Sequence, residues 1–535
     1  MERVPAMTFT APPRAGRREW IGLAVLALAC LLYVMDLTVL HLAVPAISED
    51  LRPSGTQLLW IIDIYGFMVA GFLVTMGTLG DRVGRRRLLL VGAAAFGLLS
   101  VLAAFSTSPE MLIASRALLG IAGATLAPST LSLIFTMFQD PGQRARAIAV
   151  WISAFSAGSA IGPVFGGVLL EQFWWGSVFL LALPVMALLL VLGPIVLPEY
   201  RAPDAGRLDL PSAAMSLVAV LAAIFGLKQI AQDGPGVGAA AAIIVGVVVG
   251  VLFVRRQLML PDPMIDLRLF RVPAFSASLV VNVLTIFVAV GYFLFVAQYL
   301  QLVLALSPLQ AGLWSLPSAL GFIVASNVAP RLIRLARPAY VIGSGLGVSA
   351  VGLALLTRVG GADGLAAVVA GSVVISLGLA PVLSLTTELI VGSAPPERAG
   401  AASGISETAA ELGGALGISI LGSLGVAMYR GEIAASLPAG VPDEAAAAVR
   451  DTLGGAVGVA AQLPADLGAT VLGVARDAFV HGMQAAAAIS ALVAIAVAVL
   501  ALALLRDVRS GGMVEEPGAE AEDRSGGEVE AEAAA

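Results

Sequence analysis

Cysteine, histidine and charge are scarce in this chain of 535 residues, and each scarcity excludes a class of protein. The one cysteine, Cys30, excludes an internal disulfide. One cysteine and two histidines form no metal-binding cluster, so we expect no structural or catalytic metal. Only 12% of the residues are charged, against about 25% in soluble domains, which excludes a soluble protein.

Nucleotide-binding and catalytic motifs are also missing from the sequence. It contains no Gly-x-x-x-x-Gly-Lys-Ser/Thr loop, and no polar segment is long enough for a nucleotide-binding domain. This excludes an ATP-driven pump. No nucleophile–base pair accompanies the acidic residues, so we expect neither an enzyme nor a cofactor, and no nucleic-acid partner.

Long apolar runs dominate what is present, with 59% hydrophobic residues and a mean hydropathy of +0.95. Runs of about 18–25 apolar residues, each able to cross about 30 Å of hydrocarbon, recur about fourteen times. Their approximate cores are 20–45, 57–80, 88–106, 110–137, 145–170, 176–197, 210–230, 237–254, 274–302, 309–330, 338–357, 364–393, 398–427 and 480–505. The first run is too long for a cleavable signal peptide. The sequence therefore predicts an all-α, multi-pass protein of the lipid bilayer.

Arginine clusters mark alternate loops and predict the orientation. They lie at 14–18, 82–87, 144–146, 255–271 and 331–337, whereas the other loops hold only scattered basic residues, among them the single lysine, Lys228. By the positive-inside rule, both termini lie in the cytoplasm, which requires an even number of spans.

The predicted spans divide into six, two and six, as expected when an insert joins two bundles with a substrate site between them. The predicted segments are an N-terminal tail 1–19, a first bundle 20–197, a linker with two spans 198–273, a second bundle 274–506 and a disordered acidic tail 507–535. An outer loop at 429–479 has room for a short hairpin or for amphipathic helices, and its pattern does not choose between them.

A glycine and arginine motif follows the second run. It consists of Gly77, Gly80, Asp81, Arg82, Gly84 and Arg85. The glycines permit a tight turn, and Asp81 can meet a helix N-terminus or an arginine. An arginine cluster alone would indicate only topology. The ordered pattern, however, resembles the loop signature of the major facilitator superfamily, with a structural or coupling role.

A second motif lies in the fifth run and resembles the one characteristic of drug–proton antiporters in that superfamily. It consists of Gly158, Gly162, Pro163, Gly166 and Gly167. The four-residue spacing of three glycines places them on one helix face, where a neighbouring backbone can approach, and the proline permits a kink.

Further resemblances cover the chain almost end to end. Segments 36–45 and 301–317 resemble the fourteen-span drug–proton antiporters, and segments 59–65 and 395–417 resemble QacA-type quaternary-ammonium exporters. Two positions depart from that pattern. His41 stands where members often carry Asn, and its role is open. Phe322 stands where some relatives carry an acid, which favours monovalent over divalent cations.

Four carboxylates, Asp36, Asp63, Glu407 and Glu411, lie inside apolar runs, where an ionised side chain costs at least ~2.5–3.5 kcal/mol. We interpret Asp36 and Glu407 as proton or substrate sites that face one cavity. Glu411 shares a helix face with Glu407 and either tunes it or only contacts a neighbouring helix. Asp63 lies nearer the outer end, with structural and functional interpretations equally open. Arg116, in the fourth run, is either a structural anchor or a coupling residue.

The sequence thus predicts a proton-driven antiporter that exports lipophilic, monovalent cations, such as quaternary ammonium antiseptics and dyes, by alternating access. We expect a monomer in the bacterial cytoplasmic membrane, driven by the proton gradient without a cofactor. One alternative is export of a neutral or anionic natural product for self-resistance. A more remote alternative is a membrane sensor or lipid-handling protein that transports nothing.

Overall fold

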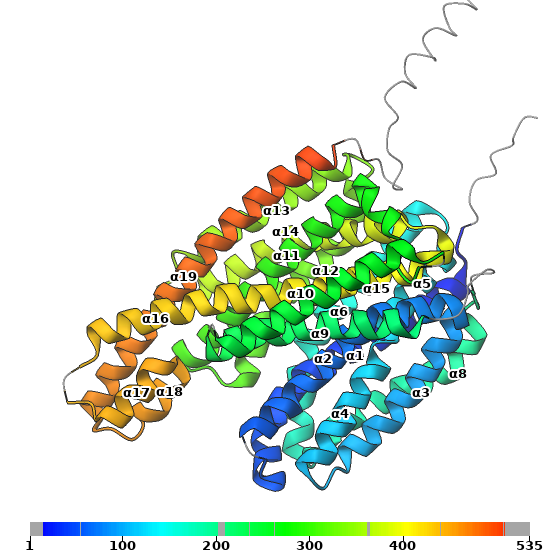
Figure 1. The fold of residues 1–535 in the computed structure, drawn as a ribbon. Helices are drawn as coiled ribbons and strands as arrows, with labels where there is room; N and C mark the ends of the chain where they lie inside the picture. The colour runs from blue at the N-terminus through cyan, green and yellow to red at the C-terminus, as the bar shows by residue number, and fades with distance from the viewer. Residues whose placement is uncertain are drawn as a thin grey trace, which may run out of the picture.

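The computed structural model describes residues 14–53, 55–201, 209–234, 236–261, 263–360, 364–438, 440–506 and 508. In these ranges the regular elements are helices that run side by side (Figure 1). Fourteen helical segments within them are long and apolar enough to cross a membrane, which confirms the number predicted from the apolar runs. The predicted tail 507–535 lies outside the described residues, apart from residue 508, as does most of the tail 1–19.

The first bundle contains eight helices among the described residues, because breaks near Gly123 and at Leu181 divide the fourth and sixth spans. The helices are α1 (Arg17–Leu51), α2 (Gly55–Val83), α3 (Arg85–Ala104), α4 (Pro109–Gly123), α5 (Leu126–Met137), α6 (Pro141–Gln172), α7 (Ser177–Leu180) and α8 (Ala182–Val196). Local chemistry sets their starts. The side chains of Ser108 and Asp140 accept hydrogen bonds from backbone N–H groups of α4 and α6, and a proline follows each cap.

Two helices, α9 (Leu210–Asp233) and α10 (Val237–Met259), form the insert between the bundles. They pack on each other at Gly226 and Gly246, where an added Cβ would lie 2.8 and 2.9 Å from the facing backbone. Arg256 and Ser212 hold Asp209 at the start of α9 by hydrogen bonds that lower the pKa of its carboxyl. Only 17% of the apolar window of α10 is buried, so this helix presents most of its surface to lipid.

The second bundle repeats the helical arrangement and adds short helices. Its elements are η1 (Leu267–Arg271), α11 (Pro273–Gln298), η2 (Tyr299–Val303), α12 (Pro308–Leu332), α13 (Pro338–Leu356), α14 (Leu365–Gly392), η3 (Pro396–Arg398), α15 (Ala399–Gly417), η4 (Ile418–Gly422), α16 (Ser423–Ser436), α17 (Asp443–Asp451), α18 (Leu453–Ala460) and α19 (Ala465–Leu504). Each bundle buries a large apolar cluster of its own. The π-helical segments η2 and η4 interrupt two of the spans.

The stretch 429–479, which the sequence left open, is largely helical. It contains the end of α16, the helices α17 and α18, and the start of α19, and Tyr429 donates a hydrogen bond to the Val449 carbonyl at 2.8 Å. At 1.5 Å per residue, the 40 residues of α19 measure about 60 Å, about twice the hydrocarbon thickness. The helix therefore projects beyond the bilayer toward α17 and α18 (Figure 1).

Helix α1 begins and α19 ends at the same end of the molecule, which we call the inner end; the opposite end, with α17 and α18, is the outer end (Figure 1). The bundles meet along two seams, α2 against α15 and α6 against α12. Ser326 and Asn327 of α12 donate hydrogen bonds to the Ala149 carbonyl and the Ser153 hydroxyl of α6. These contacts join the bundles in the inner part of the α6–α12 seam.

Candidate functional site

Asp36 is held by a buried arginine of a neighbouring helix. Arg116 Nη1 donates to Asp36 Oδ2 at 2.7 Å, with the Arg116 side chain fully buried and that of Asp36 10% exposed. Arg116 also donates to the Ile61 carbonyl at 3.0 Å and lies 4.9 Å from the centre of the Tyr65 ring. The contacts of a structural anchor are therefore present at Arg116. Its role in coupling stays a prediction.

Asp63 forms an ion pair that the sequence did not indicate. Lys228, on the inserted helix α9, donates to Asp63 Oδ1 at 2.7 Å, although 165 positions separate the two residues. The ammonium also lies 4.7 Å from the centre of the Phe67 ring. Sequence reasoning grouped Lys228 with the outer loops, whereas it lies within a helix that can span the membrane. The signal that could have found it is a lone lysine within an apolar helical run.

Glu407 and Glu411, half-buried on α15, face the first bundle. Both lie within electrostatic range of Tyr33 on α1, and Glu411 also lies within range of Tyr65 and Lys228. Neither glutamate has a basic side chain at ion-pair distance among the described residues. Helix α15 thus brings two acids without a cationic partner toward the two paired aspartates. The neighbours Tyr33 and Tyr65 are the evidence that Asp36 and Glu407 lie in the same part of the molecule. The roles of these two acids stay predictions.

Two hydroxyl groups close to these acids are also unpartnered. The Tyr65 hydroxyl and Thr408 Oγ1 are buried without a hydrogen-bond partner in the described part of the chain. Tyr65 lies in the electrostatic neighbourhood of Asp36, Arg116 and Glu411, and Thr408 follows Glu407 directly. A buried hydroxyl without a partner is costly, so such groups mark a place where a ligand or water is expected.

The arginine motif closes the inner end of the α2–α15 seam. Asp81 accepts hydrogen bonds from the backbone N–H groups of Gly400, at 3.1 Å, and Ala401, at 2.9 Å, at the start of α15. Arg85 Nε contacts the same carboxylate at 3.0 Å, and Arg85 Nη2 donates to the carbonyl of Pro396. Asp81 therefore meets both a helix N-terminus and an arginine, which confirms the expectation for this residue.

The glycines of this motif are required for different structural reasons. At Gly77, a Cβ would lie 2.3 Å from the Gly400 carbonyl oxygen, so only glycine permits this approach of α2 to α15. Gly84 has a φ of 121°, which side chains rarely adopt, and it separates α2 from α3. Gly80 and Arg82 are buried in the same turn region.

The glycine motif of the fifth span lies against α1. A Cβ at Gly158 would lie 2.5 Å from the Leu31 carbonyl oxygen, and one at Gly166 would lie 2.6 Å from Val39. Gly162, between them, is buried, while a Cβ at Gly167 would meet open space. The close approach predicted for this helix face is confirmed at Gly158. The side chains of Pro163 and His41 lie outside the described residues.

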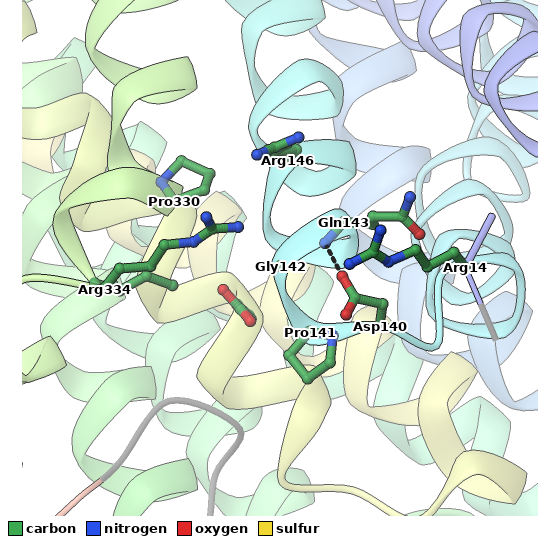
Figure 2. A pocket seen from close by; sticks show the side chains of 10 residues that line it. Arg14, Asp140, Pro141, Gly142, Gln143, Arg146, Pro330 and Arg334 are labelled. Atoms are coloured by element: carbon green, nitrogen blue, oxygen red, sulfur yellow. Dashed lines mark hydrogen bonds between the residues drawn. The ribbon is translucent and has the colours of Figure 1, made fainter. Parts of the chain in front are cut away.

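A cavity of about 540 Å³ lies at the inner end between the bundles (Figure 2). Pro330 of α12 and Arg334, just beyond its end, approach it from one side, and Arg146 and Asp140 from the other. Glu388 also lines it and is only 7% exposed. Packing of α14 against α6 and α12 accounts for this burial.

Comparison with known proteins identifies the family. The model of the Major Facilitator Superfamily matches residues 26–418. The chain belongs to the major facilitator superfamily. It is therefore a multi-pass membrane transporter rather than an enzyme, as the motifs predicted.

Several curated members of the superfamily are similar over nearly their whole length. The chain is 46% identical to the multidrug efflux pump LfrA of Mycolicibacterium smegmatis, covering 93% of this chain and 97% of the relative. It is 37% identical to the methyl viologen resistance protein SmvA of Salmonella typhimurium, over 90% and 97% of the two chains. It is also 33% identical to the tetracenomycin C resistance and export protein of Streptomyces glaucescens, over 91% of each.

Solved structures confirm the fold. The human organic anion transporter MFSD10 matches with a TM-score of 0.58 at 17% identity, over 89% of this chain and 99% of that one. A bacterial homologue of the lysosomal transporter Spinster, solved facing inward and unoccupied, matches with a TM-score of 0.54 at 18% identity, over 94% and 100%. At such identities the likeness concerns the fold alone.

Proposed function

We propose that this chain is a proton-coupled multidrug exporter of lipophilic cations in the bacterial cytoplasmic membrane. The observation that carries the proposal is the placement of Glu407 and Glu411 opposite the Asp36–Arg116 pair, as two acids at membrane depth that have no ion-pair partner in the described part of the chain. An intramembrane acid without a cation of its own is suited to hold either a proton or a cationic substrate. Relatives named as a multidrug efflux pump and a methyl viologen resistance protein support export of drugs and cations.

The proposed cycle exchanges the two kinds of cation at one place. A lipophilic cation that enters from the inner end displaces a proton from the α15 glutamates, the bundles rock, and protons return from outside. The inner end then faces the cytoplasm, in line with its arginine loops. The proton gradient drives this cycle without a cofactor. A single chain can carry it out, because each half supplies its own acids.

The energy source depends on the number of protons. One proton exchanged for one monocation moves no net charge, so only the pH gradient, at about 1.4 kcal/mol per pH unit, drives it. A second proton would also draw on the membrane potential, at about 2.3 kcal/mol per 100 mV.

Rocking requires the inner seam to open. In the present structure, Asp81 holds the start of α15, and Ser326 and Asn327 hold α6. These contacts close the inner end of both seams between the bundles. We therefore assign the structure to a state closed at the inner end.

The proposal also concerns the charge of the transported substrate. Phe322, which packs against the first bundle, supplies no acid, so we retain a preference for monovalent cations. One relative is named for resistance to methyl viologen, which is a dication, so the preference for monovalent cations needs a direct test. The relative named for tetracenomycin C export favours, as a second candidate, a neutral or anionic natural product. That candidate predicts that export survives Glu407→Gln.

Everted vesicles energised with a pH gradient test the proposal. The wild type should transport ethidium and release protons when the substrate is added. Asp36→Asn and Glu407→Gln should each abolish substrate-driven proton release, with thermal unfolding in detergent as the control for folding. If both variants exchange ethidium for protons at the wild-type rate, the proposed site is wrong.

A further inference from the structure

We propose that Lys228 is an internal occupant of a cation site on Asp63, and that its charge decides whether the transporter accepts monovalent or divalent substrates. This inference rests on the proposed export of cations and goes further, because it names a residue of the inserted helices as a determinant of substrate charge. Its experiment separates the two claims.

The surroundings of the Lys228 ammonium are those of a bound organic cation. Its Nζ lies 2.7 Å from Asp63 Oδ1 and 4.7 Å from the centre of the Phe67 ring. The Phe67 ring in turn contacts the rings of Trp60, at 6.2 Å, and Phe225, at 6.4 Å. A carboxylate beside an aromatic face is the arrangement that recognises ammonium and quaternary ammonium groups. Helices α2 and α9 thus build a cation site that the chain fills with its own lysine.

This ion pair is open to exchange, whereas the Asp36–Arg116 pair is not. The side chains of Lys228 and Asp63 are 29% and 24% exposed, against 0% and 10% for Arg116 and Asp36. A partly exposed ion pair is weaker than a buried one, because water screens both charges. Lysine also holds a carboxylate as a point charge, without the fixed fork of an arginine. A competing cation can therefore displace Lys228.

The charge of Lys228 also reaches Glu411 of α15. Helix α9 lies against both bundles, with Ile224 packed among Phe67 and Ala70 of α2 and Ala415 of α15. Glu411 lies within electrostatic range of Lys228. Lys228 thus contacts Asp63 directly and lies within electrostatic range of Glu411. Removing Lys228 adds one unpaired negative charge beside the proposed site, which favours a dication more than a monocation.

The competing interpretation is that the ion pair only tethers α9 to α2. The two interpretations differ in what they predict for the partners. A tether is broken equally by Lys228→Met and by Asp63→Asn, so both variants should change the transport of all cations in the same direction. A charge determinant predicts opposite shifts, because the first variant leaves a carboxylate and the second leaves an ammonium.

The test measures transport of tetraphenylphosphonium, a monocation, and methyl viologen, a dication, by the full-length chain in proteoliposomes with a pH gradient. We expect Lys228→Met to raise the ratio of methyl viologen to tetraphenylphosphonium transport about tenfold, the effect of one unit charge near a bound cation. Asp63→Asn should lower that ratio. Arg256→Met is the matched control, since it breaks the Asp209–Arg256 pair, which joins the start of α9 to α10 near the inner end. It should leave the ratio unchanged.

Each outcome decides the inference. Ratios that move in the same direction in both variants, or that stay within twofold of the wild type, would overturn it while the proposed function stands. A wild type that transports neither cation would overturn the proposed function, and this inference with it. If Lys228→Met does not fold, Asp63→Asn still tests the inference, because an unchanged or raised ratio in that variant would overturn it.

Discussion

The two halves of the molecule treat their membrane-embedded acids differently. In the first bundle each aspartate has a cationic partner, Arg116 for Asp36 and Lys228 for Asp63. In the second bundle Glu407 and Glu411 have none at ion-pair distance among the described residues. The acids that stand out equally in the sequence are therefore of two kinds.

The difference teaches which acids are free to exchange ligands. A carboxylate paired with a buried guanidinium cannot change partner without leaving a lone charge in the membrane. An acid without such a partner can take a proton or a cation at little structural cost. Asp36 and Arg116 of the first bundle thus form a prearranged charge pair, whereas Glu407 and Glu411 of the second bundle, together with the partly exposed Asp63, supply the exchanging groups.

The largest expected effect comes from breaking the buried pair. Arg116→Met should lower the free energy of unfolding by about 3–5 kcal/mol, because it leaves Asp36 unpaired and the Ile61 carbonyl without its donor. Denaturant or thermal unfolding in detergent measures this loss. The double variant Asp36→Asn, Arg116→Met removes both charges and should be more stable than Arg116→Met alone. Equal stability of the two variants would contradict the pairing.

A smaller effect is expected at the inner end of the α2–α15 seam, where the contacts of Asp81 hold the two bundles together. Asp81→Asn removes charge-assisted hydrogen bonds worth about 1.5–3 kcal/mol each and should favour opening of the inner end. A cysteine introduced at Ala401, which is only 4% exposed at this seam, in a Cys30→Ser background, should then react about tenfold faster with a membrane-impermeant thiol reagent added at the inner end. Asp140→Asn is the control, because Asp140 caps its own helix. An unchanged rate would refute the seam as a lock.

Glu407→Gln tests the unpaired side of the comparison. We expect substrate-driven proton release to fall at least about tenfold, which corresponds to about 1.4 kcal/mol of lost cation binding. The unfolding free energy should stay near the wild-type value, because no basic partner is left alone. A variant that is strongly destabilised would show that Glu407 has a structural partner after all, and would remove the contrast with Asp36.

The number of spans and the candidate acids could be predicted from the sequence, because hydrocarbon thickness sets the length of apolar runs and burial makes a carboxylate conspicuous. The partners could not. Asp36 and Arg116 lie 80 positions apart, and Asp63 and Lys228 lie 165 apart. Which helices meet depends on packing, which hydropathy does not encode. Helices α17 and α18 were also hidden, because nine and eight residues are too few to show a clear period.

The smallest expected effect concerns the stability contribution of the exposed pair. Lys228→Met should change the free energy of unfolding by no more than about 1 kcal/mol, since water screens a partly exposed ion pair and the methionine keeps most of the apolar contact with Phe67. Thermal unfolding in detergent, run beside Arg116→Met, measures the two pairs on one scale. A loss as large as that of Arg116→Met would mean that Lys228 is a tether like Arg116. A small loss together with altered charge selectivity would mean that the two aspartates differ in kind. Arg116 would then hold Asp36 in a fixed pair, whereas Lys228 would only fill a cation site on Asp63 that a substrate can also fill.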